Sequence, residues 1–324
     1  MKLPSTFSQP IEKEIASFCK NLSASPKELY EPMAYMLSMG GKQLRPNLLL
    51  ISCKLFGGNV KHALPAAIAI ELFHDFTLVH DDITDNAPLR RNKPSVHAKW
   101  NTNIALLSGD AMLIKAYEYI AKTPKAHLPV ILQLFNETAL KVCEGQQFDM
   151  NYETQKKVSI EDYLYMISLK TAALISASLE MGAILGGATT KDSRKMKVFG
   201  ENIGMLFQLQ DDILDVFGEQ EKVGKQTGGD IINNKKTFLL LKAMELAKGN
   251  SLKELTRLLG STSISAKQKV IGVTAIYEEL NVLQHAKKKM DAYYNSAVKL
   301  FVSIKAPEKK LLLDLTAAMM SREI

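Results

Sequence analysis

Long stretches of this sequence have the pattern of α-helices that lack a clear polar face. The segment 171–185 is one example, because it is apolar on nearly every side. A helix of this kind must be buried by other helices. Alternating β-branched runs between turn dipeptides, which would indicate strands, hardly occur. The pattern therefore predicts an all-α fold, a large helical bundle with a buried central layer.

Caps, prolines and glycines set the expected helix boundaries. Ser25-Pro26-Lys27-Glu28 indicates a helix start, with a serine N-cap, proline at the first helical position and glutamate three residues after the cap. Later helices are expected at 46–56, 64–85, 98–121, 128–149, 159–186, 191–219, 235–247, 252–259, 266–284, 285–304 and 307–321. No linker interrupts the 324 residues, so a single domain over residues 1–324 is expected.

Charge and cysteine content narrow the setting but do not identify the ligand. The 41 Lys and Arg outnumber the 34 Asp and Glu, which is compatible with nucleic acid, anionic lipid or phosphorylated small molecules. No apolar run reaches the roughly 18 uninterrupted residues of a membrane span, and the start lacks the apolar stretch of a signal peptide. Cys19, Cys53 and Cys143 are too few and too far apart for a disulfide framework. We expect a cytoplasmic protein without stable membrane insertion.

Two acidic clusters, at 81–85 and 211–215, have the same spacing. Each places aspartates at i, i+1 and i+4 of a predicted helix, within about a third of its circumference. Their neighbours are apolar, whereas a solvated acidic face would have polar neighbours and lysines one turn away. A hard divalent cation compensates such carboxylates, and Mg²⁺ keeps waters and takes phosphate oxygens of a substrate. The clusters predict a shared site for Mg²⁺ and a phosphorylated substrate.

Basic residues suited to phosphate accompany the acids. The segment 40–46 combines a glycine turn with Lys42 and Arg45 at a helix start, where backbone N–H groups and the helix dipole favour anions. Further basic groups follow the two acidic helices: Arg90-Arg91 in a predicted loop, then Gly224-Lys225 and Asn234-Lys235-Lys236. Each alone would be an ordinary surface cation, but together they bracket the acids.

Several motifs occur in a fixed order along the chain. They are GGKQLRP (40–46), ELFHDFTLVHDDITD (71–85), LRRNKPSVH (89–97), EGQQFDM (144–150), SLKT (168–171), FQLQDDILD (207–215) and GKQTGGDIINNKKT (224–237). This series resembles the trans-isoprenyl diphosphate synthases, the polyprenyl synthetase family. One departure is Asn92, where the family usually has glycine, although asparagine tolerates a left-handed backbone well. The resemblance implies an isoprenoid-synthase bundle around a central cavity, and a homodimer.

The resemblance also implies roles for the matching residues. The diphosphate of isopentenyl diphosphate would be held by Lys42, Arg45, His74 and Arg91. The allylic diphosphate would be held by Arg90, Lys170, Lys225 and Lys235, with Asp149 orienting nearby cations. Bridging Mg²⁺ ions would bind Asp81, Asp85 and Asp211, while Asp82, Asp212 and Asp215 would complete the clusters. Thr171 and Gln208 would face the reacting carbons.

The implied reaction joins isopentenyl diphosphate to dimethylallyl, geranyl or farnesyl diphosphate and gives farnesyl or geranylgeranyl diphosphate. The allylic C–O bond ionises to a carbocation once the charge of the leaving diphosphate is neutralised. The double bond of isopentenyl diphosphate then attacks C1, and a proton leaves to the departing diphosphate. Apolar walls must exclude water, which would convert the cation to an alcohol.

Product length in this family is limited by bulk at the fifth and fourth residues before the first aspartate. Phe76 and Thr77 occupy these positions, and an aromatic followed by a small residue resembles the twenty-carbon type. Phe73 is a further candidate for the floor of the pocket. We expect a product of fifteen to twenty carbons. On an ideal helical wheel Phe76 lies well round from the aspartates, so its role is implied by the resemblance alone.

Other functions remain open at this point. A longer-chain polyprenyl diphosphate synthase would share the motifs. A class I terpene cyclase also ionises an allylic diphosphate, but it needs no second diphosphate site and usually carries an Asn/Ser/Glu-type second motif. A non-catalytic partner subunit usually has a degraded second motif, whereas the aspartates at 211, 212 and 215 are intact. A basic nucleic-acid binder would leave the acids in apolar surroundings unexplained.

Overall fold

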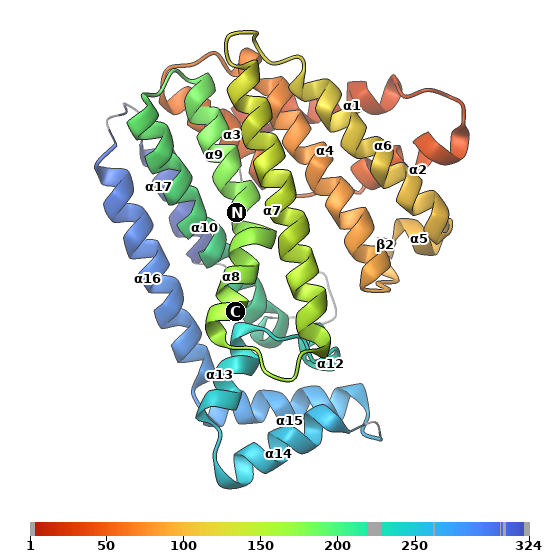
Figure 1. Ribbon diagram of the computed structural model, residues 1–324, viewed down its shortest axis with the longest axis vertical. Coiled ribbons are helices and arrows are strands. Elements are labelled where there is room, and N and C mark those ends of the chain that lie inside the picture. Colours follow the sequence, from red (N-terminus) through yellow and green to blue (C-terminus); the bar gives the residue numbers. More distant parts are fainter. Residues whose placement is uncertain (1–3, 219–227, 262, 305, 307–308, 321–324) are drawn as a thin grey trace. The chain divides into compact units, whose positions relative to one another are not determined.

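The computed structural model describes residues 4–218, 228–261, 263–304, 306 and 309–320. Helices account for nearly all of its regular structure (Figure 1), which confirms the predicted all-α fold. The chain divides into two compact units, each described here by itself. The first comprises Met1–Thr138, Ala177–Lys197 and Ile304–Leu312, and the second comprises Ala139–Ser176, Val198–Ser303 and Leu313–Ile324.

The first unit is built around a long central helix, α4 (Val60–Thr84), which packs against α3 (Leu44–Leu55) and α6 (Thr102–Ile120). Around them lie α1 (Ser5–Lys20), α2 (Lys27–Ser38), α5 (Val96–Lys99) and the two-residue strands β1 (Leu89–Arg90) and β2 (Lys93–Pro94). The unit also takes the first part of α7 (Leu128–Thr154), most of α9 (Ala173–Leu185) and the start of α10 (Thr190–Phe217).

The second unit takes the remainder of α7 and α10 together with the later helices. These are α8 (Ile160–Ile167), the π-helical turn η1 (Ser168–Ala172), α12 (Gly229–Ile232), α13 (Phe238–Leu246), α14 (Gly249–Gly260), α15 (Ala266–Glu279), α16 (Val282–Val302) and most of α17 (Lys310–Met320). Within this unit α13 packs against α8, α15 and α16, and α14 packs against α15.

The apolar helices form the core. Two helical segments, Val60–Thr84 and Ile160–Leu185, are long and apolar enough by composition to cross a membrane, but most of each is buried within the protein. Neighbouring helices approach one another closely where a small residue of one helix faces the backbone of the next. A Cβ at Gly182 of α9 would lie 2.2 Å from the carbonyl oxygen of Leu49 in α3, so only glycine fits there. The two segments are therefore core helices, and α9 packs tightly against α3.

Several boundaries differ from the sequence-based expectation. Ser25 does not cap α2, because Pro26 has an extended backbone and the helix begins one residue later, at Lys27. The helix predicted over 98–121 is interrupted at Trp100, and Asn101 starts α6 by accepting a hydrogen bond from the Ile104 N–H. The helix predicted over 159–186 contains the π-helical turn at 168–172.

Candidate active site

A two-residue hairpin positions the arginine pair in the first unit. Leu89 pairs with Pro94 and Arg90 with Lys93, so the turn consists of Arg91 and Asn92. Both turn residues have left-handed φ values, 52° and 59°. A turn with both central residues left-handed suits a tight hairpin, and asparagine adopts this conformation readily. The sequence predicted a loop here because two-residue strands give no periodic signal.

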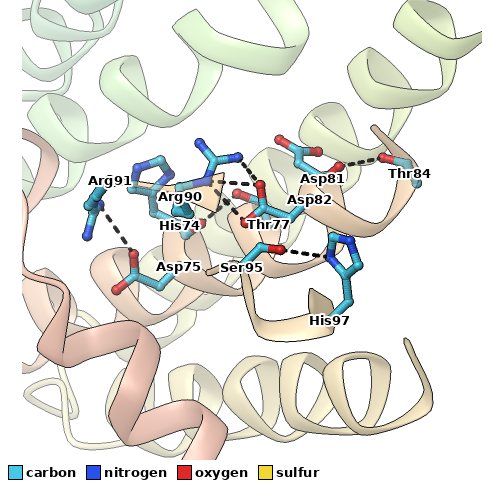
Figure 2. Close-up of polar contacts among 10 residues, drawn as sticks. All are labelled: His74, Asp75, Thr77, Asp81, Asp82, Thr84, Arg90, Arg91, Ser95 and His97. Carbon is cyan, nitrogen blue, oxygen red and sulfur yellow. Dashed lines mark hydrogen bonds and ion pairs between the residues drawn. The ribbon is translucent and has the colours of Figure 1, made fainter. Parts of the chain in front are cut away.

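Arg90 reaches back from this hairpin to the first acidic cluster. Its Nε lies 3.0 Å from Oδ1 of Asp82, and its Nη2 lies 2.5 Å from the same oxygen (Figure 2). Asp82 is 1% exposed, so this bidentate pair compensates a buried carboxylate. Burial alone would lower the pKa of Arg90, but the hydrogen bond and charge of Asp82, with the charges of Asp81 and Asp85, raise it. Arg90 is therefore a permanent cation beside the acids.

The remaining acids of this cluster are more accessible. Asp81 is half-buried on α4, and Asp85 is exposed at the C-terminal cap of the helix, where its N–H donates to the carbonyl of Asp81 at 2.9 Å. The cluster thus has one buried carboxylate held by Arg90 and two that lie nearer the surface.

The residues expected to bind the diphosphate of isopentenyl diphosphate also come together in the first unit. Nη1 of Arg45, in the first turn of α3, lies 3.1 Å from Nε2 of His74 on α4. Because arginine can only donate, Nε2 of His74 is the acceptor and the imidazole is neutral, with its proton on Nδ1. Burial and the charges of Arg45, Arg91 and Arg90 lower the pKa of His74, in agreement with this assignment. His74 can therefore offer a neutral N–H donor.

Gly41 brings the hairpin turn close to the start of α3. A Cβ at Gly41, whose φ is 154°, would lie 2.8 Å from Nη2 of Arg91. The guanidinium of Arg91 consequently lies against the backbone of the glycine turn at Gly41, four residues before the half-buried Arg45. Lys42 follows Gly41 and is exposed. The predicted group of Lys42, Arg45, His74 and Arg91 is thus gathered in one region.

In the second unit a chain of hydrogen bonds holds the other acidic cluster. Thr171 donates to Oε1 of Gln208 at 2.7 Å, and Nε2 of Gln208 donates to Oδ1 of Asp212 at 3.0 Å. The hydroxyl of buried Tyr163 donates to Oδ2 of the same carboxylate. Burial and the charge of Asp230 raise the pKa of Asp212, while the two hydrogen bonds oppose that shift. Thr171, Gln208 and Asp212 were expected here from the sequence, whereas Tyr163 was not.

The π-helical turn places Lys170 and Thr171. Nζ of Lys170 bonds Oδ2 of Asp149 on α7 at 2.6 Å, as the sequence suggested for that aspartate. Two glycines let neighbouring helices approach this turn: a Cβ at Gly145 would lie 2.3 Å from the Lys170 nitrogen, and one at Gly204 would lie 2.4 Å from Cα of Ala172. π-Helical turns within α-helices often mark functional sites.

Asp215 ends the second cluster and is bound by the segment that begins at Gly228. Its Oδ2 accepts from the Asp230 N–H at 3.0 Å, and the Lys235 N–H bonds the Asp230 carbonyl at 2.9 Å. Asp230 was missed in the sequence as a site residue, although it lies within the motif at 224–237. Lys225, expected to bind the allylic diphosphate, lies outside the described residues.

The residues expected to limit product length form an aromatic row on α4. The rings of Phe73 and Phe76 are 5.6 Å apart, and Phe73 also meets Phe135 of α7 at 5.4 Å. Phe76 packs edge-on against His80 at 4.7 Å. The Thr77 hydroxyl donates to the His74 carbonyl one turn earlier. Phe76 is thus fixed between two rings of its own helix.

The acidic clusters have the donor set that Mg²⁺ uses in phosphate-binding enzymes. Within the described ranges, no three His, Cys, Asp or Glu side chains form a ready-made metal site. Mg²⁺ is usually held by one or two carboxylates together with water and substrate phosphates rather than by a complete protein cage. The accessible carboxylates of Asp81 and Asp85, one turn apart, fit that mode of binding.

Comparison with known proteins gives matches over most of the chain. The Polyprenyl synthetase family model matches residues 26–279, which include both acidic clusters. A geranylgeranyl diphosphate synthase of Methanosarcina mazei is 37% identical over 92% of this chain and 91% of its own length. One from Sulfolobus acidocaldarius is 38% identical over 86% of this chain and 84% of its own. A crystal structure of a geranylgeranyl pyrophosphate synthase is 39% identical, covers 100% of both chains and has a TM-score of 0.93.

Proposed function

The chain belongs to the polyprenyl synthetase family and is a short-chain trans-prenyltransferase, and we propose that it joins isopentenyl diphosphate to an allylic diphosphate to give geranylgeranyl diphosphate. The supporting observation is the anion-binding group formed by the cations Arg45 and Arg91 with the neutral imidazole of His74. A terpene cyclase, which ionises a single allylic diphosphate, has no need for this second anion site.

Isopentenyl diphosphate binds at the start of α3. Arg45 and Arg91 supply permanent charge, and the exposed Lys42 supplies a further cation. His74 contributes the Nδ1–H of a neutral imidazole, because Arg45 occupies Nε2. Backbone N–H groups at the start of α3 add the favourable field of a helix N-terminus.

The allylic diphosphate binds to Arg90, Lys170, Lys225 and Lys235. Arg90 is fixed by Asp82, and Lys170 is fixed by Asp149, so both cations are oriented before the substrate arrives. Pre-oriented charges are effective where negative charge develops on a leaving group, because they need no reorganisation during the reaction. Asp82 and Asp149 therefore act through the cations that they hold.

Asp81 and Asp85 of the first cluster and Asp211 of the second are the proposed Mg²⁺ ligands, and Asp215 supports the second cluster. When bound, Mg²⁺ neutralises the charge of the departing diphosphate. Asp212 is already engaged by Tyr163 and Gln208, so its part is to orient the cluster and the amide of Gln208.

Condensation follows loss of the diphosphate. The C–O electron pair leaves with the diphosphate, and the π electrons of isopentenyl diphosphate attack C1 of the allylic cation. The proton lost from the new chain goes to the departing diphosphate, so charge and atoms balance. Thr171 and Gln208 stabilise the cation through oxygen dipoles, since Asp212 holds the amide of Gln208 with Oε1 toward Thr171.

The growing chain is limited by Phe76, with Phe73 and Thr77 beside it. The aromatic row from Phe76 to Phe135 supports a fixed floor, and the relatives reported above act as geranylgeranyl diphosphate synthases. A twenty-carbon product is consistent with the aromatic row and with the activity of these relatives. The alternative is a longer product, in which Phe76 would have to turn aside.

A homodimer is supported by the exposed face of α6. Leu107 and Ile114, seven residues apart on one side of the helix, are each 62% exposed, and Tyr117 of the same helix adds further apolar area. Exposed apolar side chains at such spacing suit a partner helix. We also propose a cytoplasmic location, which the three free cysteines support. Size-exclusion chromatography with light scattering tests the dimer.

Product analysis tests the proposed function. The purified protein is incubated with Mg²⁺ and labelled isopentenyl diphosphate, with dimethylallyl, geranyl or farnesyl diphosphate offered in turn. We expect product only when both substrates are present and a predominant twenty-carbon diphosphate. Cyclic hydrocarbon from an allylic substrate alone, or no product with any primer, would exclude the proposed reaction.

A further inference from the structure

Asp75 is a buried carboxylate that the proposed reaction does not use. It lies on α4 next to His74 and is only 2% exposed, and its Oδ1 accepts no hydrogen bond. Glu71, one turn earlier on the same helix, is also buried. Burying a carboxyl group is costly unless a partner compensates it. Two buried carboxyl groups next to a site that binds anions therefore need a compensating partner.

The compensating charge comes from the arginines of the anion site. Nη2 of Arg91 lies 3.8 Å from Oδ1 of Asp75 (Figure 2), and the side chain of Arg91 is 27% exposed. The same Nη2 is the guanidinium atom nearest to Gly41, whose missing Cβ leaves room for it. The Arg91 guanidinium is therefore bounded by a carboxylate of α4 and by the backbone of the glycine turn.

The two buried carboxyl groups, of Glu71 and Asp75, do not cancel the positive charge of the anion site. Burial raises the pKa of Glu71 to about 7, and burial together with the charge of Glu71 raises that of Asp75, while Arg45 and Arg91 oppose both shifts. Two buried carboxyl groups one turn apart therefore retain a proton near neutral pH. We assign the proton to Glu71 and the negative charge to Asp75, whose Oδ1 lies 3.8 Å from Nη2 of Arg91. One negative charge then faces the two arginines, which leaves the site attractive to a diphosphate.

We propose that Asp75 is a positioning residue, whose carboxylate holds the Arg91 guanidinium against Gly41 in the orientation that receives the diphosphate of isopentenyl diphosphate. This inference rests on the proposed function. The backbone of Arg91 is fixed by the hairpin turn, but its long side chain has several rotatable bonds. An anchor at the guanidinium reduces the loss of side-chain entropy that Arg91 would otherwise undergo when the diphosphate binds.

Steady-state kinetics of Asp75→Asn test this role. Asparagine keeps the size of the side chain and removes the charge. We expect the KM for isopentenyl diphosphate to rise about tenfold, with the KM for the allylic substrate and kcat changed less than about threefold. Asp75→Glu, which keeps a carboxylate, should recover most of the affinity. Asp110→Asn on α6, a carboxylate 63% exposed, is the matched control and should leave all three parameters unchanged.

A double-mutant cycle separates positioning from general stability. In an Arg91→Ala background, Asp75→Asn should change the KM for isopentenyl diphosphate by less than about twofold, because the group it positions is gone. Additive effects, an unchanged or lower KM in the single variant, or a uniform loss of all parameters would overturn the inference. If Asp75→Asn does not fold, the smaller uncharged variant Asp75→Ala takes its place, and the same selective rise in the KM for isopentenyl diphosphate is expected. Failure of the wild type to elongate would instead reject the proposed function.

Discussion

Tyr163 donates its hydroxyl proton to the carboxylate of Asp212, and both side chains are buried. Through this bond α8 holds the second acidic cluster of α10. Asp212 also accepts from Gln208, which in turn accepts from Thr171. A tyrosine outside the acidic motifs thus controls the orientation of a residue proposed to face the reacting carbons.

Tyr163→Phe should lower both stability and turnover. The variant leaves a buried carboxylate without one of its donors, which costs about 1–3 kcal/mol of unfolding free energy. Because Gln208 is oriented by the same carboxylate, kcat should fall about tenfold or more. Urea denaturation and steady-state kinetics measure the two effects. Tyr165→Phe, an exposed tyrosine on the same helix, is the matched control. Equal behaviour of the two variants would contradict this role.

Gly145→Ala should disturb the π-helical turn. In an ordinary helix this change would stabilise by about 1 kcal/mol, but here the new Cβ would lie 2.3 Å from the Lys170 backbone nitrogen. We expect a lower melting temperature and a loss of activity as Lys170 and Thr171 shift. Gly260→Ala in α14, where nothing lies within 4 Å of the new Cβ, is the control and should be neutral or slightly stabilising. A harmless Gly145→Ala would show that the close approach is unimportant.

Features with a local sequence signal were predicted, and features made by packing were not. Asp81 and Asp211 could be placed on helices because periodicity is a local property. The π-helical turn around Lys170 was missed, because its surroundings include glycines of α7 and α10 that are far away in sequence. Tyr163 and Asp75 look like ordinary helix residues, and only the fold shows that they face Asp212 and Arg91.

The two acidic clusters can be tested by single substitutions. Asp81→Asn and Asp211→Asn should each lower kcat at least about 100-fold, because each removes a proposed Mg²⁺ ligand. Both residues are half-buried, so circular dichroism should show an unchanged helical content. The loss should be partly relieved by raising Mg²⁺. Near-normal turnover of either variant at low Mg²⁺ would refute the metal role of that cluster.

The raised pKa of Glu71 predicts how the stability of the folded protein depends on pH. The folded protein keeps the carboxyl protonated up to a pKa of about 7, whereas an unfolded glutamate ionises near pH 4.3, roughly. The folded state therefore binds more protons between these values, so its stability is fully present below about pH 4 and falls as pH rises toward 7. Glu71→Gln removes this contribution. The unfolding free energy of the variant minus that of the wild type should increase by up to roughly 1.4 kcal/mol per pH unit, and parallel curves from pH 5 to 8 would contradict the assignment.

Phe76→Ala should lengthen the product by at least one isoprene unit. The Phe76 ring is held between Phe73 and His80, so it cannot turn aside without disturbing the row. Removing the ring leaves a void in an otherwise fixed wall, and a growing apolar chain gains by filling such a space. Radiolabelled isopentenyl diphosphate with farnesyl diphosphate as primer, followed by chromatography of the dephosphorylated products, measures the distribution. Phe56→Ala, a half-buried phenylalanine at the end of α3, is the matched control and should keep the wild-type distribution. If both variants give the wild-type distribution, the limit on chain length lies elsewhere in the protein, whereas a shift in Phe76→Ala alone assigns it to this ring.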